Sequence, residues 1–522
     1  MTVVSDRLAR DIAAVSTATL CSRVLGFVRD VGIAALLGAG AASDAFFAAL
    51  LIPNLFRRLL AEGALNAAFI PIWIRIRTDR GSTATRGFAE EILGTMLAGL
   101  GLAALACAML APAVIHLIAP GFNVTDQRFG LAVSYLRIVA PYVGIAGLVA
   151  VAAAALNAEG RVGAVSFGLV VYNVVVIAAL GVVASGSTSA DPGVVLSSAA
   201  VFAGLAQFLI IGAALLRLPS PPLRPRFIHT ADARRFFAAA LPGVIAAGIP
   251  QLKFIAGVMV ASPSASAVSW LYYTYRIYEL PLGVVSVVVA SVMGPRIADA
   301  LRTSKDLTVI QSRASAIAVG LALPAAIGMA VLAEPIASAL FEHGAFGPRD
   351  AAAVAAALAA IAAGLPGHAL EKVLGSIAFA HEDTRLPMFA ALGGLVVAVA
   401  ASLAFFPIFG HVGVAAGIAA SGWVGTVVLS TVLARRRWLR IDNDLSKQVL
   451  HLILVAIAMG LTTFAARVVL HSTFGTASTA PARLVIVAVL VAFGLSVYLL
   501  GLKLFGVARM SDLFRAIRQR RS

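Results

Sequence analysis

The chain has 522 residues, of which 61% are hydrophobic and 12% charged, with a mean hydropathy of +0.97. This composition excludes a soluble globular domain and indicates a protein that crosses a membrane many times. The formal net charge of +16 is therefore expected to mark membrane topology rather than a nucleic-acid partner.

Apolar runs long enough to cross about 30 Å of hydrocarbon recur along the whole chain, separated by short polar turns. We therefore predict an all-α, polytopic membrane protein with fourteen transmembrane helices. In chain order the predicted spans are residues 12–37, 43–74, 87–119, 127–157, 162–186, 193–217, 236–262, 265–294, 309–341, 350–380, 386–408, 411–434, 448–470 and 483–505.

The distribution of Lys and Arg predicts the orientation of these helices. If the N-terminus is cytoplasmic, 28 of the 40 Lys and Arg residues flank the cytoplasmic ends of the spans and 4 lie outside. The outer four are Arg128, Arg349, Arg467 and Arg483. Because positive residues accumulate on the cytoplasmic side, both termini are predicted to be cytoplasmic.

Cysteine and histidine give no sign of catalytic or metal chemistry. Cys21 and Cys107 are isolated within apolar spans, and the eight histidines are scattered. We therefore expect no disulfide framework, no metal site, no cofactor and no enzymatic activity.

Three pairs of segments repeat at a common offset of about 223 residues. "LAPAVIHLIAPGF" (110–122) resembles "LAEPIASALFEHGAF" (332–346), and "ALNAEGRVGA" (155–164) resembles "AFAHEDTRLPM" (378–388). Residues 43–47, at the start of the second predicted span, likewise resemble residues 268–272, near the start of the eighth. Since each period covers six predicted helices, the two copies should share one orientation and be related by an axis along the membrane normal.

This repeat predicts three parts of the chain. Residues 1–222 and 223–446 would form two six-helix lobes around a central cavity, and 447–522 would add helices 13 and 14 with a basic cytoplasmic tail.

Eight cations lie well inside the predicted spans: Arg23, Arg29, Arg57, Arg58, Arg137, Lys253, Arg276 and Lys372. Comparably placed acids are fewer, namely Asp30, Glu62, Glu279 and Glu371. A charge at the bilayer centre costs about 2.5 to 3.5 kcal/mol even on insertion scales, so such residues normally face a hydrated cavity or a partner.

The first helix places Arg23, Gly26 and Asp30 within about 60° of one another, with Arg29 displaced by about 60° more. This polar arc is expected to face the cavity. In the second span, Pro53 should kink the helix beside Asn54.

Arg58 and Glu62 are i, i+4 partners in the second span, whereas Arg57 lacks a local acid. The charges in the spans could simply lock helices together. Because cations outnumber acids, we favour an anionic ligand, and the planar guanidinium group suits phosphate oxygens.

Several motifs resemble the lipid II flippase family (MurJ, also called MviN) of the multidrug/oligosaccharidyl-lipid/polysaccharide exporter superfamily. They are "SRVLGFVRD", "SDAFFAALLIPNLFRRLLAEGALNAAFIP", "YYTYRIYELPLGV", "LFEHGAF" and "KVLGSIAFAHEDTRLP". The resemblance runs through essentially the whole chain and implies a transporter that moves undecaprenyl-pyrophosphate-linked peptidoglycan precursor to the outer leaflet.

The family's cationic cavity positions match Arg23, Arg29, Arg57 and Arg276, and its important acids match Asp44 and Glu62. From the residues themselves we add Asn54, Arg58, Lys253 and Glu279 as candidate substrate-binding residues. Two positions depart from the family pattern. Leu51 stands where relatives often have Lys or Arg, and Tyr275 stands where they often have Asp.

The resemblance implies lipid II as the substrate and the bacterial cytoplasmic (inner) membrane as the location. Membrane lipids are expected contacts, and cell-wall synthesis or division proteins are candidate partners. Outward movement of a pyrophosphate is electrically downhill across an inside-negative membrane, which favours a cycle driven by the membrane potential.

Four other functions compete with this one. A flippase for another polyprenyl-linked oligosaccharide would need the same phosphate-binding cations and remains an alternative. A drug exporter should have an acidic cavity and usually twelve helices, and a glycosyltransferase should have catalytic carboxylates at a membrane face. A division scaffold predicts no surplus of intramembrane charge. These last three fit the sequence less well.

Overall fold

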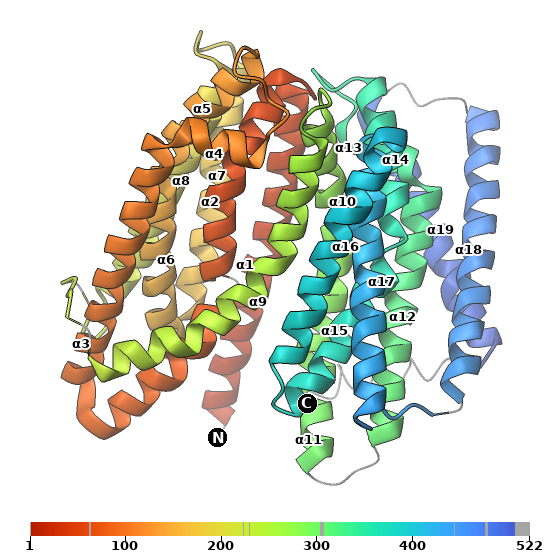
Figure 1. Cartoon of the computed structure of the whole chain (residues 1–522). Helices are drawn as coiled ribbons and strands as arrows, with labels where there is room; N and C mark the ends of the chain where they lie inside the picture. The colour runs from red at the N-terminus through yellow and green to blue at the C-terminus, as the bar shows by residue number, and fades with distance from the viewer. Residues whose placement is uncertain are drawn as a thin grey trace. The chain divides into compact units, whose positions relative to one another are not determined.

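The computed structural model describes residues 2–61, 64–222, 224–228, 230–302, 307–442, 444–474 and 479–506. The secondary structure in these ranges is helical throughout (Figure 1), which confirms the predicted all-α fold. The chain forms two compact units, Met1–Ser269 and Trp270–Ser522.

The first unit is built from nine helices and the first turn of a tenth. They are α1 (Thr2–Leu37), α2 (Ala41–Ala61), α3 (Ala64–Met109), α4 (Ala111–Ile118), α5 (Gln127–Val139), α6 (Pro141–Ala158), α7 (Val162–Ala184), α8 (Pro192–Leu215) and α9 (Ala231–Ala261).

The second unit begins inside α10 and contains the remaining helices. They are α10 (Ala267–Val288), the π-helical turn η1 (Val289–Met293), α11 (Gly294–Arg302), α12 (Leu307–Val331), α13 (Ala333–Phe341), α14 (Pro348–Ala362), α15 (Leu365–Ala380), α16 (Arg385–Phe409), α17 (His411–Arg435), α18 (Asp444–Phe474) and α19 (Ala480–Leu504).

Nine helices within the described ranges are long and apolar enough to cross a membrane, or eleven if each of two bent pairs counts as one span. Each of the fourteen predicted spans overlaps helix. The number of crossings, fourteen, stays a prediction. α1 is not among these nine helices. Its described side chains include Arg23, Arg29 and Asp30, which make it less apolar.

α3 is broken near its middle. Gly81 has φ 80° and ψ −178°, a backbone conformation that only glycine adopts readily. At this point α3 turns back on itself (Figure 1). The turn falls within the basic segment that the sequence places between the second and third spans.

The core of the first unit includes an aromatic cluster formed by α3 and α9. The Phe69 ring lies 5.4 Å from Trp73, 5.3 Å from Phe88 and 5.9 Å from Phe236, measured between ring centroids. All four side chains are buried. Such aromatic burial fixes α9 against α3, so the predicted seventh span is part of the first compact unit.

The repeated segments adopt matching local structures. Leu110 and Leu332 precede the short helices α4 and α13 with nearly equal backbone angles, φ −96° and ψ 19° against φ −100° and ψ 14°. Gly160 and Glu382, in the second pair of segments, both have positive φ, at 73° and 61°. These local matches support the repeat, whereas the lobe boundaries and the axis stay predictions.

α18 and α19 pack on the second unit. Tyr498 of α19 is buried and its hydroxyl donates to the Gly320 carbonyl of α12 at 2.9 Å. Leu452, Val455 and Met459 of α18 join Tyr498 in one apolar cluster with Val319. These last two helices are therefore an integral part of the unit.

Candidate functional site

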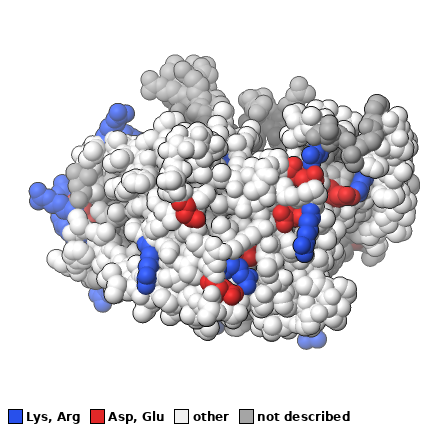
Figure 2. Space-filling view, turned by 90° about the horizontal axis from the view of Figure 1, so that it is seen from above, with Lys and Arg blue, Asp and Glu red and all other residues white. Residues whose placement is uncertain are grey.

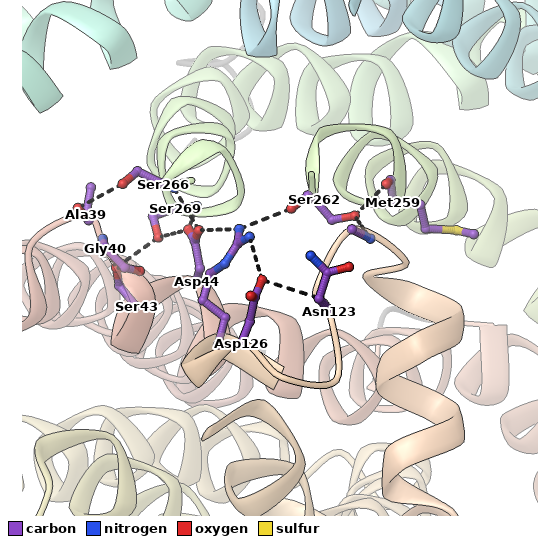
Figure 3. A network of polar contacts seen from close by, with 12 residues as sticks. Ala39, Gly40, Ser43, Asp44, Asn123, Asp126, Met259, Ser262, Ser266 and Ser269 are labelled. Atoms are coloured by element: carbon purple, nitrogen blue, oxygen red, sulfur yellow. Dashed lines mark hydrogen bonds and ion pairs between the residues drawn. The ribbon is translucent and has the colours of Figure 1, made fainter. Parts of the chain in front are cut away.

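A buried carboxylate in α2 holds the first turn of α10 (Figure 3). Asp44 is fully buried. Its Oδ1 accepts hydrogen bonds from the Ser269 backbone N–H at 2.9 Å and the Ser269 hydroxyl at 2.5 Å, and its Oδ2 accepts from the Ser266 N–H at 2.8 Å. Because the first N–H groups of a helix have no partner within it, Asp44 acts as a cap supplied by another helix.

The loop between α4 and α5 and the first turn of α5 join the same network. Arg128 Nη1 lies 3.8 Å from Asp44 Oδ2 and donates to the Ser262 carbonyl at 3.1 Å. Gly121 donates its N–H to the Ser262 hydroxyl at 2.8 Å. A Cβ at Gly121 would lie 2.1 Å from the Pro263 nitrogen, so only glycine permits this approach.

Arg29 is oriented by protein contacts on α1 and α7. Its Nη2 lies 2.8 Å from Asp30 Oδ1, its Nε donates to the same oxygen at 3.1 Å, and its Nη1 donates to Asn173 Oδ1 at 3.1 Å. The Asn173 amide also donates to the Ser22 and Leu169 carbonyls, both at 3.1 Å. The guanidinium is thus fixed in one orientation, with 17% of the side chain exposed.

The predicted polar arc on α1 is divided between two environments. Gly26 packs next to Asn173, and Asp30 is fully buried beneath Arg29. Arg23 is exposed and has no hydrogen-bonded or ion-pair partner within the described part of the chain. The expectation that the whole arc faces a cavity is therefore wrong for Gly26 and Asp30, because both residues are buried.

Arg57 of α2 is half-buried, and its Nε lies 3.5 Å from Asn54 Oδ1, just past the predicted kink at Pro53. Both Arg57 and Arg29 are close enough to the buried Tyr142 of α6 to act on its hydroxyl electrostatically. Two of the predicted cations, from different helices, therefore lie near one side chain within the first unit.

The remaining candidates of the first unit have different environments. Arg58 is half-buried in α2, and Lys253 of α9 is buried, with 6% exposed. Glu62, the predicted partner of Arg58, lies outside the described residues. Leu51, which departs from the family pattern, is buried.

Arg276 and Glu279 belong to the second unit. They form an i, i+3 ion pair on α10 with 3.0 Å between Nη1 and Oε2, and each side chain is about one quarter exposed. Tyr275, the second departure from the family pattern, is half-buried with its ring centroid 6.1 Å from that of Tyr278. Arg276 is thus held by a local acid, as Arg29 is.

Three contributors to these contacts are missing from the candidates that the sequence suggests. Asn173 is a single amide in the apolar run "LVVYNVVV", which is a signal for a buried hydrogen bond. Ser269 lies in one of the repeated segments, which alone does not indicate its role. Arg128 is predicted only as an outer cation, yet it lies against Asp44. No group of three or more metal-ligating side chains occurs in the described ranges.

Solved membrane transporters share this fold. A structure described as lipid II flippase MurJ in an inward closed conformation aligns with a TM-score of 0.78 at 20% identity, and covers 96% of this chain and 99% of that one. An inward-facing multidrug resistance MATE family transporter of the MOP superfamily aligns with a TM-score of 0.66 at 14% identity, covering 82% and 96%. The chain therefore has the multi-pass helical fold of these structures.

The sequence comparison is more specific. The family profile described as lipid II flippase MurJ matches residues 33–485. The probable lipid II flippase MurJ of Rhizobium meliloti is 34% identical, covering 98% of this chain and 96% of that protein, and the lipid II flippase MurJ of Burkholderia cenocepacia is 32% identical, covering 82% and 84%. The chain belongs to the lipid II flippase MurJ family.

Proposed function

We propose that this chain transports lipid II, the undecaprenyl-pyrophosphate-linked disaccharide peptide, from the inner to the outer leaflet of the bacterial cytoplasmic membrane. The observation that carries this proposal is the nearly full-length match to proteins named as lipid II flippases. The protein acts as a transporter by alternating access and not as an enzyme. Its chemistry is the recognition of an anionic head group.

Oriented arginines recognise the pyrophosphate in this proposal. Arg29 is held by Asp30 and Asn173, Arg57 by Asn54, and Arg276 by Glu279. Because a guanidinium group can donate two parallel hydrogen bonds, a preset orientation favours phosphate oxygens and lowers the entropy lost on binding. Arg23, Arg58, Lys253 and Glu62 complete the proposed substrate-binding set.

Asp44 has a positioning role in this proposal. Its two oxygens accept hydrogen bonds from Ser266 and Ser269 and lie next to Arg128. Asp44 therefore does not contact the substrate directly. It holds the first turn of α10, and Arg276 lies about two turns further along the same helix. A change at Asp44 would therefore act on transport through the placement of α10.

The membrane potential drives the proposed cycle. A pyrophosphate with about two negative charges gains about 2.3 kcal/mol per charge per 100 mV when it moves outward across an inside-negative membrane. The same potential draws the empty, cation-bearing site back toward the cytoplasm, so no coupling ion is required.

The proposed orientation places both termini in the cytoplasm. Figure 2 looks down on the structure from above the view of Figure 1, and on this face most of the surface is uncharged, with basic and acidic side chains scattered. At the proposed cytoplasmic end of the first unit, exposed arginines are frequent, including Arg75, Arg77, Arg80 and Arg235. This asymmetry follows the positive-inside rule. Membrane lipids surround the chain, and cell-wall synthesis or division proteins are proposed partners.

Complementation of a strain depleted of its own lipid II flippase tests the proposal. Expression of this chain should restore growth and should reduce the lipid-linked precursor that accumulates in the inner leaflet. Growth without a change in precursor distribution, or failure of both at normal protein levels, would contradict it. Export of a different polyprenyl-linked oligosaccharide in the same strain would favour the alternative substrate.

A further inference from the structure

A cavity of about 650 Å³ lies between α13, α18 and α19 in the second unit. It is separate from the residues assigned to substrate binding. One part of its lining is charged, and the other is formed by apolar side chains of α18 and α19, including Phe464, Val468 and Ile486. In the proposed orientation the cavity lies at the outer ends of these helices.

The charged part of the cavity consists of two ion pairs. Arg467 of α18 pairs with Glu334 of α13, and its Nη1 donates to the Val331 carbonyl at 3.0 Å. Arg483 of α19 pairs with Glu342 at 2.9 Å. The cavity therefore contains two positive and two negative side chains. Their formal charges cancel, and a ligand can contact a positive and a negative group at the same time.

Arg483 retains unused hydrogen-bonding capacity. Its Nη1 lies 2.9 Å from Glu342 Oε1 and donates to the Ser338 carbonyl at 3.5 Å, whereas its Nε is buried and has no hydrogen-bond partner within the described part of the chain. A buried donor without an acceptor is unfavourable, so an anionic oxygen in the cavity would improve the environment of this guanidinium group.

The apolar wall adjoins the lipid-facing surface. Phe464 is 51% and Val468 is 50% exposed, and both line the cavity. On a helix that crosses a membrane, such exposed apolar side chains meet acyl chains. An occupant must therefore combine an acyl chain with a head group that carries both signs of charge.

We propose that this cavity binds an outer-leaflet phospholipid of the phosphatidylethanolamine type. The phosphate meets Arg483 and Arg467, the primary ammonium donates to the glutamates, and an acyl chain lies along α18. A choline head group lacks N–H donors, and a glycerol head group lacks the positive charge, so both fit less well. The proposal is independent of the transported substrate.

The test is native mass spectrometry of the purified full chain with equimolar phosphatidylethanolamine, phosphatidylcholine and phosphatidylglycerol of identical acyl chains. We expect phosphatidylethanolamine to be retained preferentially and Arg483→Gln to reduce its retention by about tenfold. The matched control is Arg349→Gln, an exposed arginine outside the cavity lining, which should retain the preference.

A second variant removes only negative charge. The double substitution Glu334→Gln with Glu342→Gln leaves both arginines in place, so the preference should shift from phosphatidylethanolamine to anionic phosphatidylglycerol. Equal retention of the three lipids by the unmodified chain would overturn the proposal. So would an unchanged preference in the double variant, measured on protein that elutes as a single folded species.

Discussion

Asp44 accepts two hydrogen bonds from Ser269, a residue 225 positions further along the chain, at 2.9 Å from the backbone N–H and 2.5 Å from the hydroxyl. The carboxylate thereby ties α2 to the first turn of α10. Full burial of Asp44 makes this contact costly to disturb, because no water is at hand to replace a lost acceptor.

Replacement of Asp44 by Asn should therefore destabilise the first unit. The amide keeps the shape of the carboxylate but directs an NH2 group at an N–H donor, and we expect a loss of about 1 to 3 kcal/mol. Thermal unfolding of purified protein measures the effect. Asp79→Asn, at an exposed position of α3, is the control and should leave the unfolding temperature unchanged.

The Arg29 and Asp30 pair allows binding to be separated from folding. Arg29→Ala alone removes the guanidinium group that pairs with a fully buried carboxylate, at a cost of about 3 to 5 kcal/mol. Arg29→Ala combined with Asp30→Asn removes both charges and should restore much of the stability but not transport.

Protein level and precursor translocation in a depletion strain distinguish these outcomes. If the double variant transports as well as the unmodified chain, then Arg29 serves only to neutralise Asp30, and the proposed role in anion binding is wrong.

Much of the fold could be predicted from the sequence, because helix positions depend on local apolar runs and turn residues. The turns at Gly160 and Glu382 fall between predicted spans, and the short helices α4 and α13 lie in one pair of repeated segments, although the sequence predicts each as the end of a longer span. The contacts between helices could not be predicted in this way. The choice of Asn173 as the partner of Arg29, 144 positions away, depends on which helix faces meet.

The contacts of the arginines at the outer ends of the spans could not be predicted from the sequence either. From the sequence, Arg128 and Arg483 look suitable as inactive controls, since both are predicted at the outer ends of spans. The structure instead places Arg128 beside Asp44 and Arg483 in an ion pair with Glu342. Arg349, which is exposed, is the better control.

Substitutions of Arg276 should separate charge from geometry. Arg276→Ala should abolish transport, whereas Arg276→Lys should retain part of it, because lysine keeps the charge but lacks the planar fork. Translocation at matched protein levels is the measurement, with Arg349→Ala as the control. Full activity of Arg276→Ala would exclude a role in substrate binding.

The stability of the second unit should depend on pH through His343, which lies between α13 and α14. Burial, together with the nearby Arg483 guanidinium, lowers the pKa of His343 below its ordinary value of 6.5. The folded chain therefore favours the neutral imidazole, so this contribution is complete above pH 6.5 and is lost progressively as the pH falls below it.

Unfolding temperatures between pH 7.5 and about 5 measure this contribution. His343→Gln should reduce the decline with falling pH, whereas His116→Gln, at an exposed position, should not. An identical decline in the His343 variant and the unmodified chain would show that other groups cause it.

The most direct measurement is lipid II translocation by the purified chain in proteoliposomes under an imposed membrane potential. We predict that lipid II moves toward the side that corresponds to the cell exterior, that collapse of the potential slows it, and that the Arg29→Ala, Asp30→Asn double variant abolishes it. No translocation by correctly folded protein, or equal translocation by the double variant, would contradict the account.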